Sequence, residues 1–136
     1  MTFGLKEEEG EQGKAGFDAW VSFLVTTLGP MMGLCNWFGQ HQDQKNEDAY
    51  ERCGAQVYRC FRVLEEQIKG HGGKWVLGGK GRTAVDFHFE PWRRQVGFAG
   101  LSLGEYPTLK AWVERLQGLS EVVRAYDSMK EGEEAR

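Results

Sequence analysis

The chain has 136 residues, of which 40% are hydrophobic and 12% aromatic, and its formal net charge is −3. This length and composition fit one domain with one apolar core. The sequence has no basic stripe with interleaved aromatic residues, so no nucleic-acid partner is expected.

The first predicted helix runs from Gly16 to about Gln40, because apolar residues recur at helical spacing over several turns. These residues are Trp20, Phe23, Leu24, Thr27, Leu28 and Met31. Pro30 has no amide to donate to the carbonyl of Thr26, which predicts a bend there. The bend at Gly29–Pro30 is expected to leave a concavity that a small apolar molecule could occupy.

Four further helices are predicted, which makes the domain all-α with about five helices. The second helix runs from about Asn46 to Lys69 and ends at the glycines of "GHGGK". The third begins at Thr83, where "T-x-x-D" resembles a capping box, and runs to about Phe98. The fourth begins near Tyr106 with Pro107 at its first position, and the fifth begins at Ser120 as N-cap.

The predicted helices occupy residues 16–130 and leave charged, glycine-dotted tails at 1–15 and 131–136, which are expected to be disordered. No run of about 18 consecutive apolar residues occurs, so no membrane span is expected. Cys35, Cys53 and Cys60 are an odd number without CxxC spacing. Free thiols of this kind favour a reducing compartment and therefore the cytoplasm, and no metal site is predicted from them.

Three motifs in the later part of the chain carry a family resemblance: "WVLGGKGRTAVD", "EYPTLKAWVERL" and "SEVVRAY". They resemble the C-terminal helical domain of the glutathione transferases, in which a "(Y/W)(L/V)xG" loop leads into "T-x-A-D" and then "(F/Y)PxLxxW". The stretches "LGPMMGLCNWF" and "YERCGAQVYRCFRVLEEQI" are similar to the Nu-class and fungal nitrogen-regulator branch. The resemblance covers roughly residues 20–126.

The resemblance implies that the thioredoxin-like half, which binds and activates glutathione in the family, is not within this chain. Glutathione is therefore expected as a cofactor only if such a domain is supplied separately, and no other cofactor is predicted. The family pattern also implies a hydrophobic substrate pocket. The residues expected to shape it are Trp20, Phe23, Thr27, Met31, Phe38 and Trp92. A homodimer is expected, because full-length relatives pair partly through the first two of these helices.

The third helix departs from the family pattern at His88 and Glu90, where the branch usually has small or apolar residues. At about 100° per residue the two side chains point roughly 160° apart, so they cannot form a pair on one helix face. Glu90 shares a face with Arg93 and Arg94, which by itself indicates a solvated ion-pair surface. If the helix is central, as the resemblance implies, Glu90 becomes a candidate general acid or base.

The leading hypothesis is a protein that binds a hydrophobic small molecule and transforms it without glutathione, by elimination, isomerisation or cyclisation. Glu90 and His88 would transfer protons and Arg93 would tune a carboxylate or polarise a carbonyl. The resemblance suggests fungal secondary metabolism as its setting. Two alternatives stay open: the hydrophobic-substrate half of a conventional glutathione transferase, and a non-enzymatic protein-interaction module.

Overall fold

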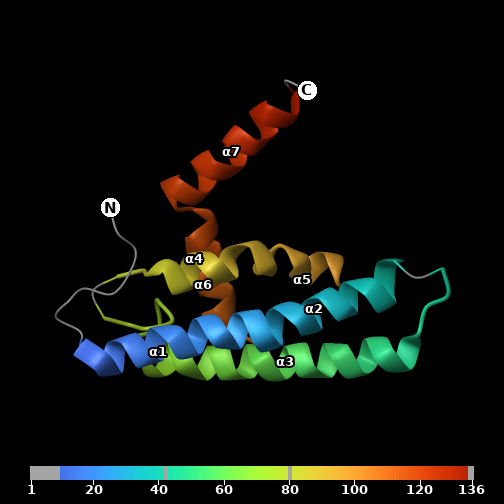
Figure 1. The fold of residues 1–136 in the computed structure, drawn as a ribbon, viewed down its shortest axis with the longest axis horizontal. Coiled ribbons are helices and arrows are strands. Elements are labelled where there is room, and N and C mark those ends of the chain that lie inside the picture. Colours follow the sequence, from blue (N-terminus) through green and yellow to red (C-terminus); the bar gives the residue numbers. More distant parts are fainter. Residues whose placement is uncertain (1–9, 42, 80, 135–136) are drawn as a thin grey trace.

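The computed structural model describes residues 10–41, 43–79 and 81–134, and these residues form helices joined by turns and loops, with no strand among them (Figure 1). The predicted all-α class is confirmed. The helical hydrophobic spacing explains this result: in the first predicted stripe Leu24 and Leu28 are buried, and Trp20, Phe23 and Met31 pack against the core. The buried residues form a single core that is shared by the successive helices.

The chain opens with one continuous helical run of four segments. These are α1 (Gly10–Phe23), the π-helix η2 (Leu24–Leu28), α2 (Gly29–Asn36) and the π-helix η3 (Trp37–His41). Pro30 lies in the first turn of α2, directly after η2. A proline removes one backbone donor, and the π-helical turn before it is a common way to accommodate such a fault in an α-helix. The run begins at Gly10, inside the stretch that the sequence analysis treated as a disordered tail.

The stretch Gly13–His41 is long and apolar enough to cross a membrane, by length and composition alone. No membrane span was expected from the sequence, because polar residues and glycines interrupt the apolar residues of this stretch. In the structure Leu24, Leu28, Met32 and Cys35 of this helix are buried in the core, and α2 packs along α3. A helix that packs in a bundle needs apolar residues on its buried face. The apolar residues of this stretch that contact the core therefore have a role in the fold itself.

The second helix, α3 (Glu47–Gly70), matches its predicted bounds closely. The Asn46 side chain accepts a hydrogen bond of 3.0 Å from Ala49 N and caps the first turn. At the other end, Gly72 and Gly73 adopt positive φ values, which favour glycine. Figure 1 shows α3 lying side by side with the first helical run. In the same view α4 and α5 lie above the first helical run.

The third predicted helix is divided in two: α4 (Ala84–Arg93) and α5 (Gln95–Phe98). Pro91 lies inside α4, and the break follows within a turn of it at Arg94.

The carboxylate of Asp86 accepts from Thr83 N at 2.8 Å, which is half of the predicted capping box. It also accepts from Val76 N at 3.1 Å and from the indole of Trp112 at 2.9 Å. Asp86 thus connects the loop before α4, α4 itself and α6.

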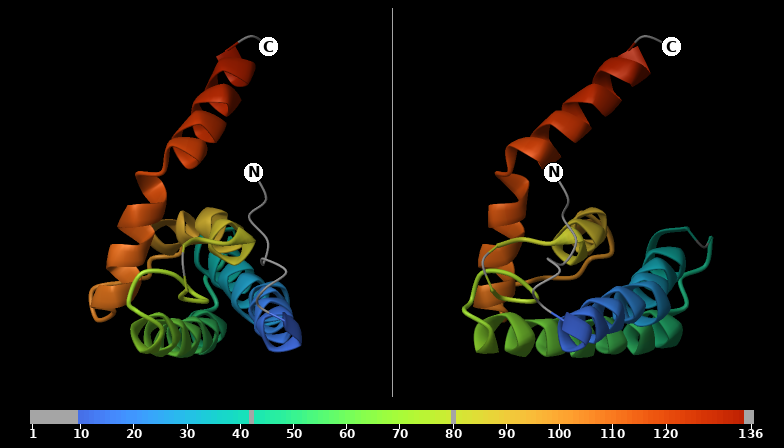
Figure 2. Two further views of the ribbon diagram at one scale, coloured as in Figure 1. Left: turned by 90° about the vertical axis from the view of Figure 1, so that its left-hand side faces the viewer. Right: turned by 60° about the vertical axis from the view of Figure 1, so that its left-hand side comes forward.

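The last two helices are α6 (Pro107–Gln117) and α7 (Ser120–Glu134). α6 packs against α3 and α4, and its first free amides donate to the carboxylate of Glu65 on α3. α7 rises away from the bundle, as both views in Figure 2 show. It continues to Glu134, so most of the stretch predicted as a C-terminal tail is helical. Val122 is its one buried residue in the part of the chain described here.

Candidate functional site

Glu90 lies on the inner side of α4 and is almost completely buried, with 3% of its surface exposed. The solvated ion-pair surface that its charged neighbours suggested is therefore wrong for this residue. The central placement that the family resemblance implied is correct. A buried carboxylate requires partners that compensate its lost hydration.

Two arginines on the same helix supply that compensation. Oε1 of Glu90 accepts from Nη2 of Arg93 at 3.1 Å and from Nε of Arg94 at 3.0 Å. The side chain of Arg93 is 11% exposed and that of Arg94 is 39% exposed. Arg93 also lies against the amide of Gln117 at the end of α6, 2.9 Å from the oxygen in the amide orientation that allows it to accept. Both i,i+3 and i,i+4 pairs predicted from the sequence are thus formed.

The other oxygen of Glu90 reaches the C-terminal helix. The hydroxyl of Tyr126 on α7 donates to Oε2 at 2.9 Å, and the guanidinium carbon of Arg94 lies 3.4 Å from the centre of the Tyr126 ring. Burial, followed by the hydrogen bond and the negative charge of Glu90, raises the pKa of Tyr126 above its usual value, although Arg94 opposes this shift. The phenol therefore remains protonated at neutral pH and acts as a donor.

His88 lies on the opposite side of α4 and is exposed. This agrees with the predicted angle between the two side chains, which excludes a proton relay between them. His41 and His71 are exposed as well, as expected from their positions at the ends of helices. Among the residues that the structure describes, no three histidine, cysteine or acidic side chains are grouped so that they could hold a metal ion.

Trp92 fills the space beside the proline. A Cβ atom at Gly29 would lie 3.1 Å from the indole of Trp92 and 3.0 Å from the carbonyl oxygen of Leu24. The absence of a side chain at Gly29 therefore allows the Trp92 ring of α4 to lie against the backbone of α2 next to Pro30. An apolar cavity of only about 20 Å³ remains among Leu28, Met32 and Trp92.

The other residues that were predicted to shape a pocket lie along the first helical run. Each is neither fully buried nor fully exposed: Trp20, Phe23, Thr27, Met31 and Phe38. Trp20 and Phe23 pack edge to face with ring centres 5.3 Å apart. All but Thr27 and Phe38 are packed against the core by one side. Their outer sides stay partly exposed along the helix.

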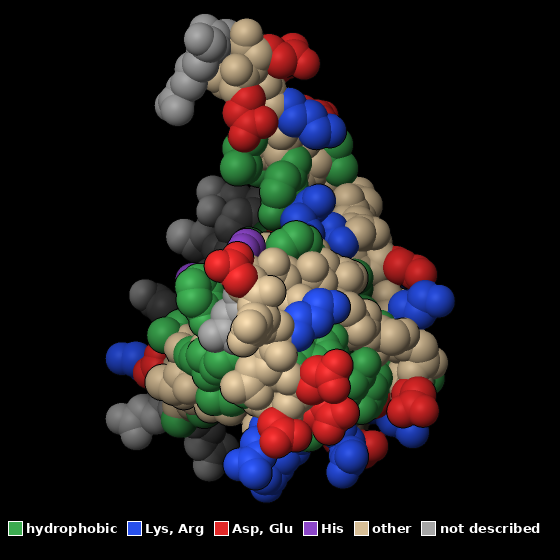
Figure 3. All heavy atoms as spheres, turned by 90° about the vertical axis from the view of Figure 1, so that its right-hand side faces the viewer, with side chains coloured by type: hydrophobic (Ala, Val, Ile, Leu, Met, Phe, Trp, Pro, Cys, Tyr) green, Lys and Arg blue, Asp and Glu red, His purple; other side chains and the backbone are tan. Residues whose placement is uncertain are grey.

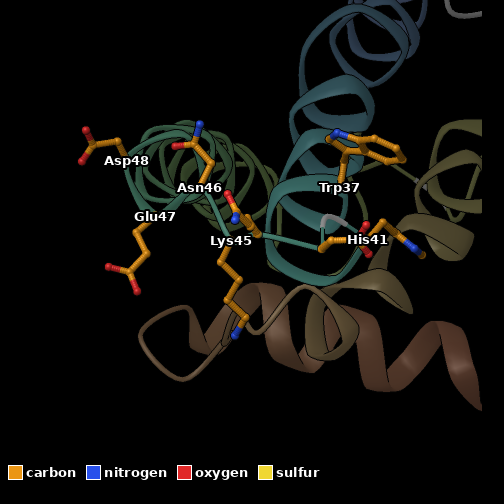
Figure 4. Close-up of a pocket in the computed structure, with 8 residues that line it drawn as sticks. Trp37, His41, Lys45, Asn46, Glu47 and Asp48 are labelled. Carbon is orange, nitrogen blue, oxygen red and sulfur yellow. The ribbon is translucent and has the colours of Figure 1, made fainter.

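A wide, open hollow lies at the far end of the molecule, where η3 turns into α3. It has a volume of about 910 Å³ and is lined by Trp37, His41 and residues 43–48. Figure 4 shows that Glu47 and Asp48 point away from Trp37 and His41. The whole lining is solvent-exposed, and Figure 3 shows acidic and basic side chains interspersed over this end. The charged groups do not converge on a common point, so the hollow lacks the features of a catalytic site.

The comparisons with known proteins place the chain in a family. The family model "Glutathione S-transferase, C-terminal domain" matches residues 23–119, which is most of the chain and lies within the predicted domain. The chain therefore belongs to the glutathione S-transferase family and contains the C-terminal helical domain of that family.

Individual relatives agree with this assignment. The chain is 30% identical over 98 residues to the disulfide-bond oxidoreductase YfcG of Escherichia coli, covering 72% of this chain and 44% of the relative. It is 29% identical over 119 residues to the glutathione S-transferase verG of Clonostachys rogersoniana, covering 82% and 49%. The chain thus spans about half the length of the curated relatives that it matches.

Solved structures show the same fold at lower identity. Ure2p in complex with S-hexylglutathione has a TM-score of 0.82 and 22% identity, and the match covers 91% of this chain and 58% of that one. The glutathione transferase URE2P6 from Phanerochaete chrysosporium, in complex with oxidized glutathione, has a TM-score of 0.79 and 24% identity, with 90% and 56% covered. These likenesses show that the chain shares the fold of these structures over most of its length.

Proposed function

We propose that this chain is the hydrophobic-ligand half of a glutathione-transferase-like protein and that a thioredoxin-like half supplies the glutathione site. The observation that supports this function best is the row of half-buried apolar side chains on α1 and α2, which includes Trp20, Phe23 and Met31. These residues are anchored in the core by one side and present the other side outward. Apolar surface of this kind is commonly covered by a ligand or another domain.

The bonding of Glu90 favours this function over the glutathione-independent acid/base enzyme. Oε1 is occupied by two guanidinium groups and Oε2 by the hydroxyl of Tyr126. A general acid or base needs a direct or water-mediated path to the substrate proton. His88 is accessible, but no second polar group from another helix is bonded to it in the described structure.

The acid/base hypothesis, including its setting in secondary metabolism, remains a separate prediction with its own test. If Glu90, His88 and Arg93 perform proton transfer, Glu90→Gln and His88→Ala will each lower turnover strongly while the circular dichroism spectrum stays unchanged. If these residues only stabilise the fold, the turnover of a substrate will decrease in proportion to the loss of folded protein. His88→Ala will then leave the turnover unchanged.

The binding proposal can be tested with an anilinonaphthalene sulfonate probe, whose fluorescence rises in apolar surroundings. Phe23→Gln and Met31→Gln should each weaken binding about tenfold, which corresponds to about 1.4 kcal/mol. Val63→Gln is the matched control, because Val63 is 43% exposed on α3, outside the proposed surface. Equal binding by all three variants and by the unaltered protein would exclude this surface as the ligand site.

A homodimer is part of the proposal, because the family commonly pairs through its helical domain. Val25 on η2 is 63% exposed and lies on the same helical run as the proposed apolar surface, where a second copy of the chain could cover it. Light scattering during size-exclusion chromatography should give twice the chain mass at micromolar concentration. Val25→Glu should shift the mass toward a monomer, whereas an unaltered monomeric mass in the parent protein would refute the pairing.

A further inference from the structure

Glu90, Arg93, Arg94 and Tyr126 form a cluster in which the positive and negative charges do not balance. One carboxylate faces two guanidinium groups, and the raised pKa of Tyr126 keeps the phenol neutral. The cluster therefore carries one net positive charge. Glu90 is the sole carboxylate paired with Arg94 among the described residues, and it engages that arginine through Nε.

Glu90 and Tyr126 together hold the guanidinium of Arg94 in a fixed orientation. Nε is bonded to Glu90 at 3.0 Å, and the face of the guanidinium lies on the ring of Tyr126, 3.4 Å from its centre. The side chain nevertheless remains 39% exposed, whereas that of Arg93 is 11% exposed. An arginine held by stacking and by one ionic bond loses little conformational entropy when its terminal nitrogens bind an anion.

From this geometry we propose that Arg94 forms a carboxylate-binding site between α4 and α7, separate from the apolar surface proposed for hydrophobic ligands. The planar fork of the terminal nitrogens matches a carboxylate in a bidentate arrangement. A carboxylate brings one negative charge and neutralises the cluster, whereas a phosphate dianion would leave it with excess negative charge. The site therefore favours a carboxylate over a phosphate dianion.

Nuclear magnetic resonance of the arginine Nε–H groups tests the site directly. The Nε–H groups of Arg93 and Arg94 donate to a buried carboxylate, which slows their exchange with water. Sodium acetate should shift the Arg94 signal in a saturable manner at constant ionic strength, with sodium chloride as the balancing salt. Sodium phosphate at pH 8 should give a weaker shift, and a stronger one would overturn the preference for a carboxylate.

Variants separate a specific site from general attraction to positive charge. Arg94→Gln should abolish the saturable acetate-induced changes of the Tyr126 ring signals, whereas Tyr126→Phe should retain acetate binding because it keeps the aromatic ring. Arg59→Gln, which alters an exposed arginine on α3, should leave binding unchanged. Equal acetate affinity in Arg94→Gln and Arg59→Gln, or the absence of any saturable shift in the parent protein, would refute the proposal. Loss of hydrophobic-probe binding would leave it intact, so the two proposals fail separately.

Discussion

The phenol of Tyr126 donates to the carboxylate of Glu90 across 2.9 Å, and this contact joins the C-terminal helix α7 to the central helix α4. Further attachments of α7 are the stacking of Arg94 on the Tyr126 ring, the buried side chain of Val122 and the ion pair between Glu121 and Arg82. From Asp127 onward every described residue of α7 is exposed. The orientation of α7 therefore depends on a small number of contacts near its beginning.

Glu90→Gln should lower the free energy of unfolding by about 2–3 kcal/mol, because it leaves two arginines without their shared counter-charge. The figure is below that for a fully buried pair, since Arg94 is partly solvated. Urea denaturation followed by circular dichroism measures the change. Glu114→Gln on the exposed side of α6 is the control, and a change of the same size there would contradict the assignment.

Alkaline pH should loosen α7 before it unfolds the bundle. The pKa of Tyr126 is raised in the folded state, so folding favours the protonated phenol. The corresponding stability is fully present below the unfolded value of about 10 and is lost as pH rises through the higher folded value. Hydrogen exchange of α7 amides cannot be followed easily at this pH, so limited proteolysis is the preferred measurement. Tyr126→Phe should remove the increase in protease cleavage of α7 at alkaline pH that the ionisation of this phenol causes. The same pH dependence of cleavage in Tyr126→Phe and in the parent protein would argue against this role of Tyr126.

Glu65→Gln should destabilise α6 by about 1–2 kcal/mol, which is typical of the loss of a good helix N-cap. The two carboxylate oxygens of Glu65 accept from Thr108 N at 3.0 Å and from Leu109 N at 2.6 Å. Glutamine replaces one acceptor with a donor, which leaves one amide unsatisfied. Thermal unfolding measures the loss, with Glu66→Gln as the exposed neighbour for comparison. Equal melting temperatures for the two variants would contradict the cap.

Asp86→Asn should cost about 2–3 kcal/mol, because three N–H groups donate to this carboxylate in the interior and an amide cannot accept all three. The fluorescence of Trp112 should also change, since its indole N–H donates to the same group. Asp127→Asn on exposed α7 is the control. A wild-type melting temperature for Asp86→Asn would show that the loop before α4 is anchored by other contacts.

The cavity under α4 should accept one additional methyl group. Val113 lines this space of about 20 Å³, and Val113→Ile should raise the free energy of unfolding by about 0.5–1 kcal/mol, within the range seen for cavity-filling substitutions. Val63→Ile on the exposed side of α3 should have little effect. Destabilisation by Val113→Ile would show that the cavity walls cannot yield enough to admit the larger side chain.

The helices could be predicted from the sequence because their apolar periodicity is local. Asn46, Pro107 and Ser120 mark helix starts that the structure reproduces. The burial of Glu90 could not be derived from its own helix, where nearby arginines suggested a solvated face. Only the family resemblance indicated that this helix is central.

The long-range partners of the buried acids were beyond sequence reasoning for a different reason. Tyr126 reaches Glu90 only because of the direction in which the chain leaves α6, and Glu65 caps a helix that begins more than 40 residues later. The contact of the Trp92 indole with Gly29 is likewise not indicated by the sequence. The space available to a side chain at a helix crossing depends on tertiary packing, which the helical spacing of apolar residues does not specify.

The π-helical turn at Leu24–Leu28 also affects how this chain should be aligned and engineered. Such a turn accommodates one residue more than an α-helix of the same rise, so a relative without it would need a single-residue gap at this point. Because the turn absorbs that extra residue, deleting one residue from it would restore ordinary winding and leave the segments before and after it in nearly the same rotational relation. Trp20 and Phe23 would then keep nearly their present direction relative to Met31, whereas a deletion within α1 would rotate the residues before it by about 100°.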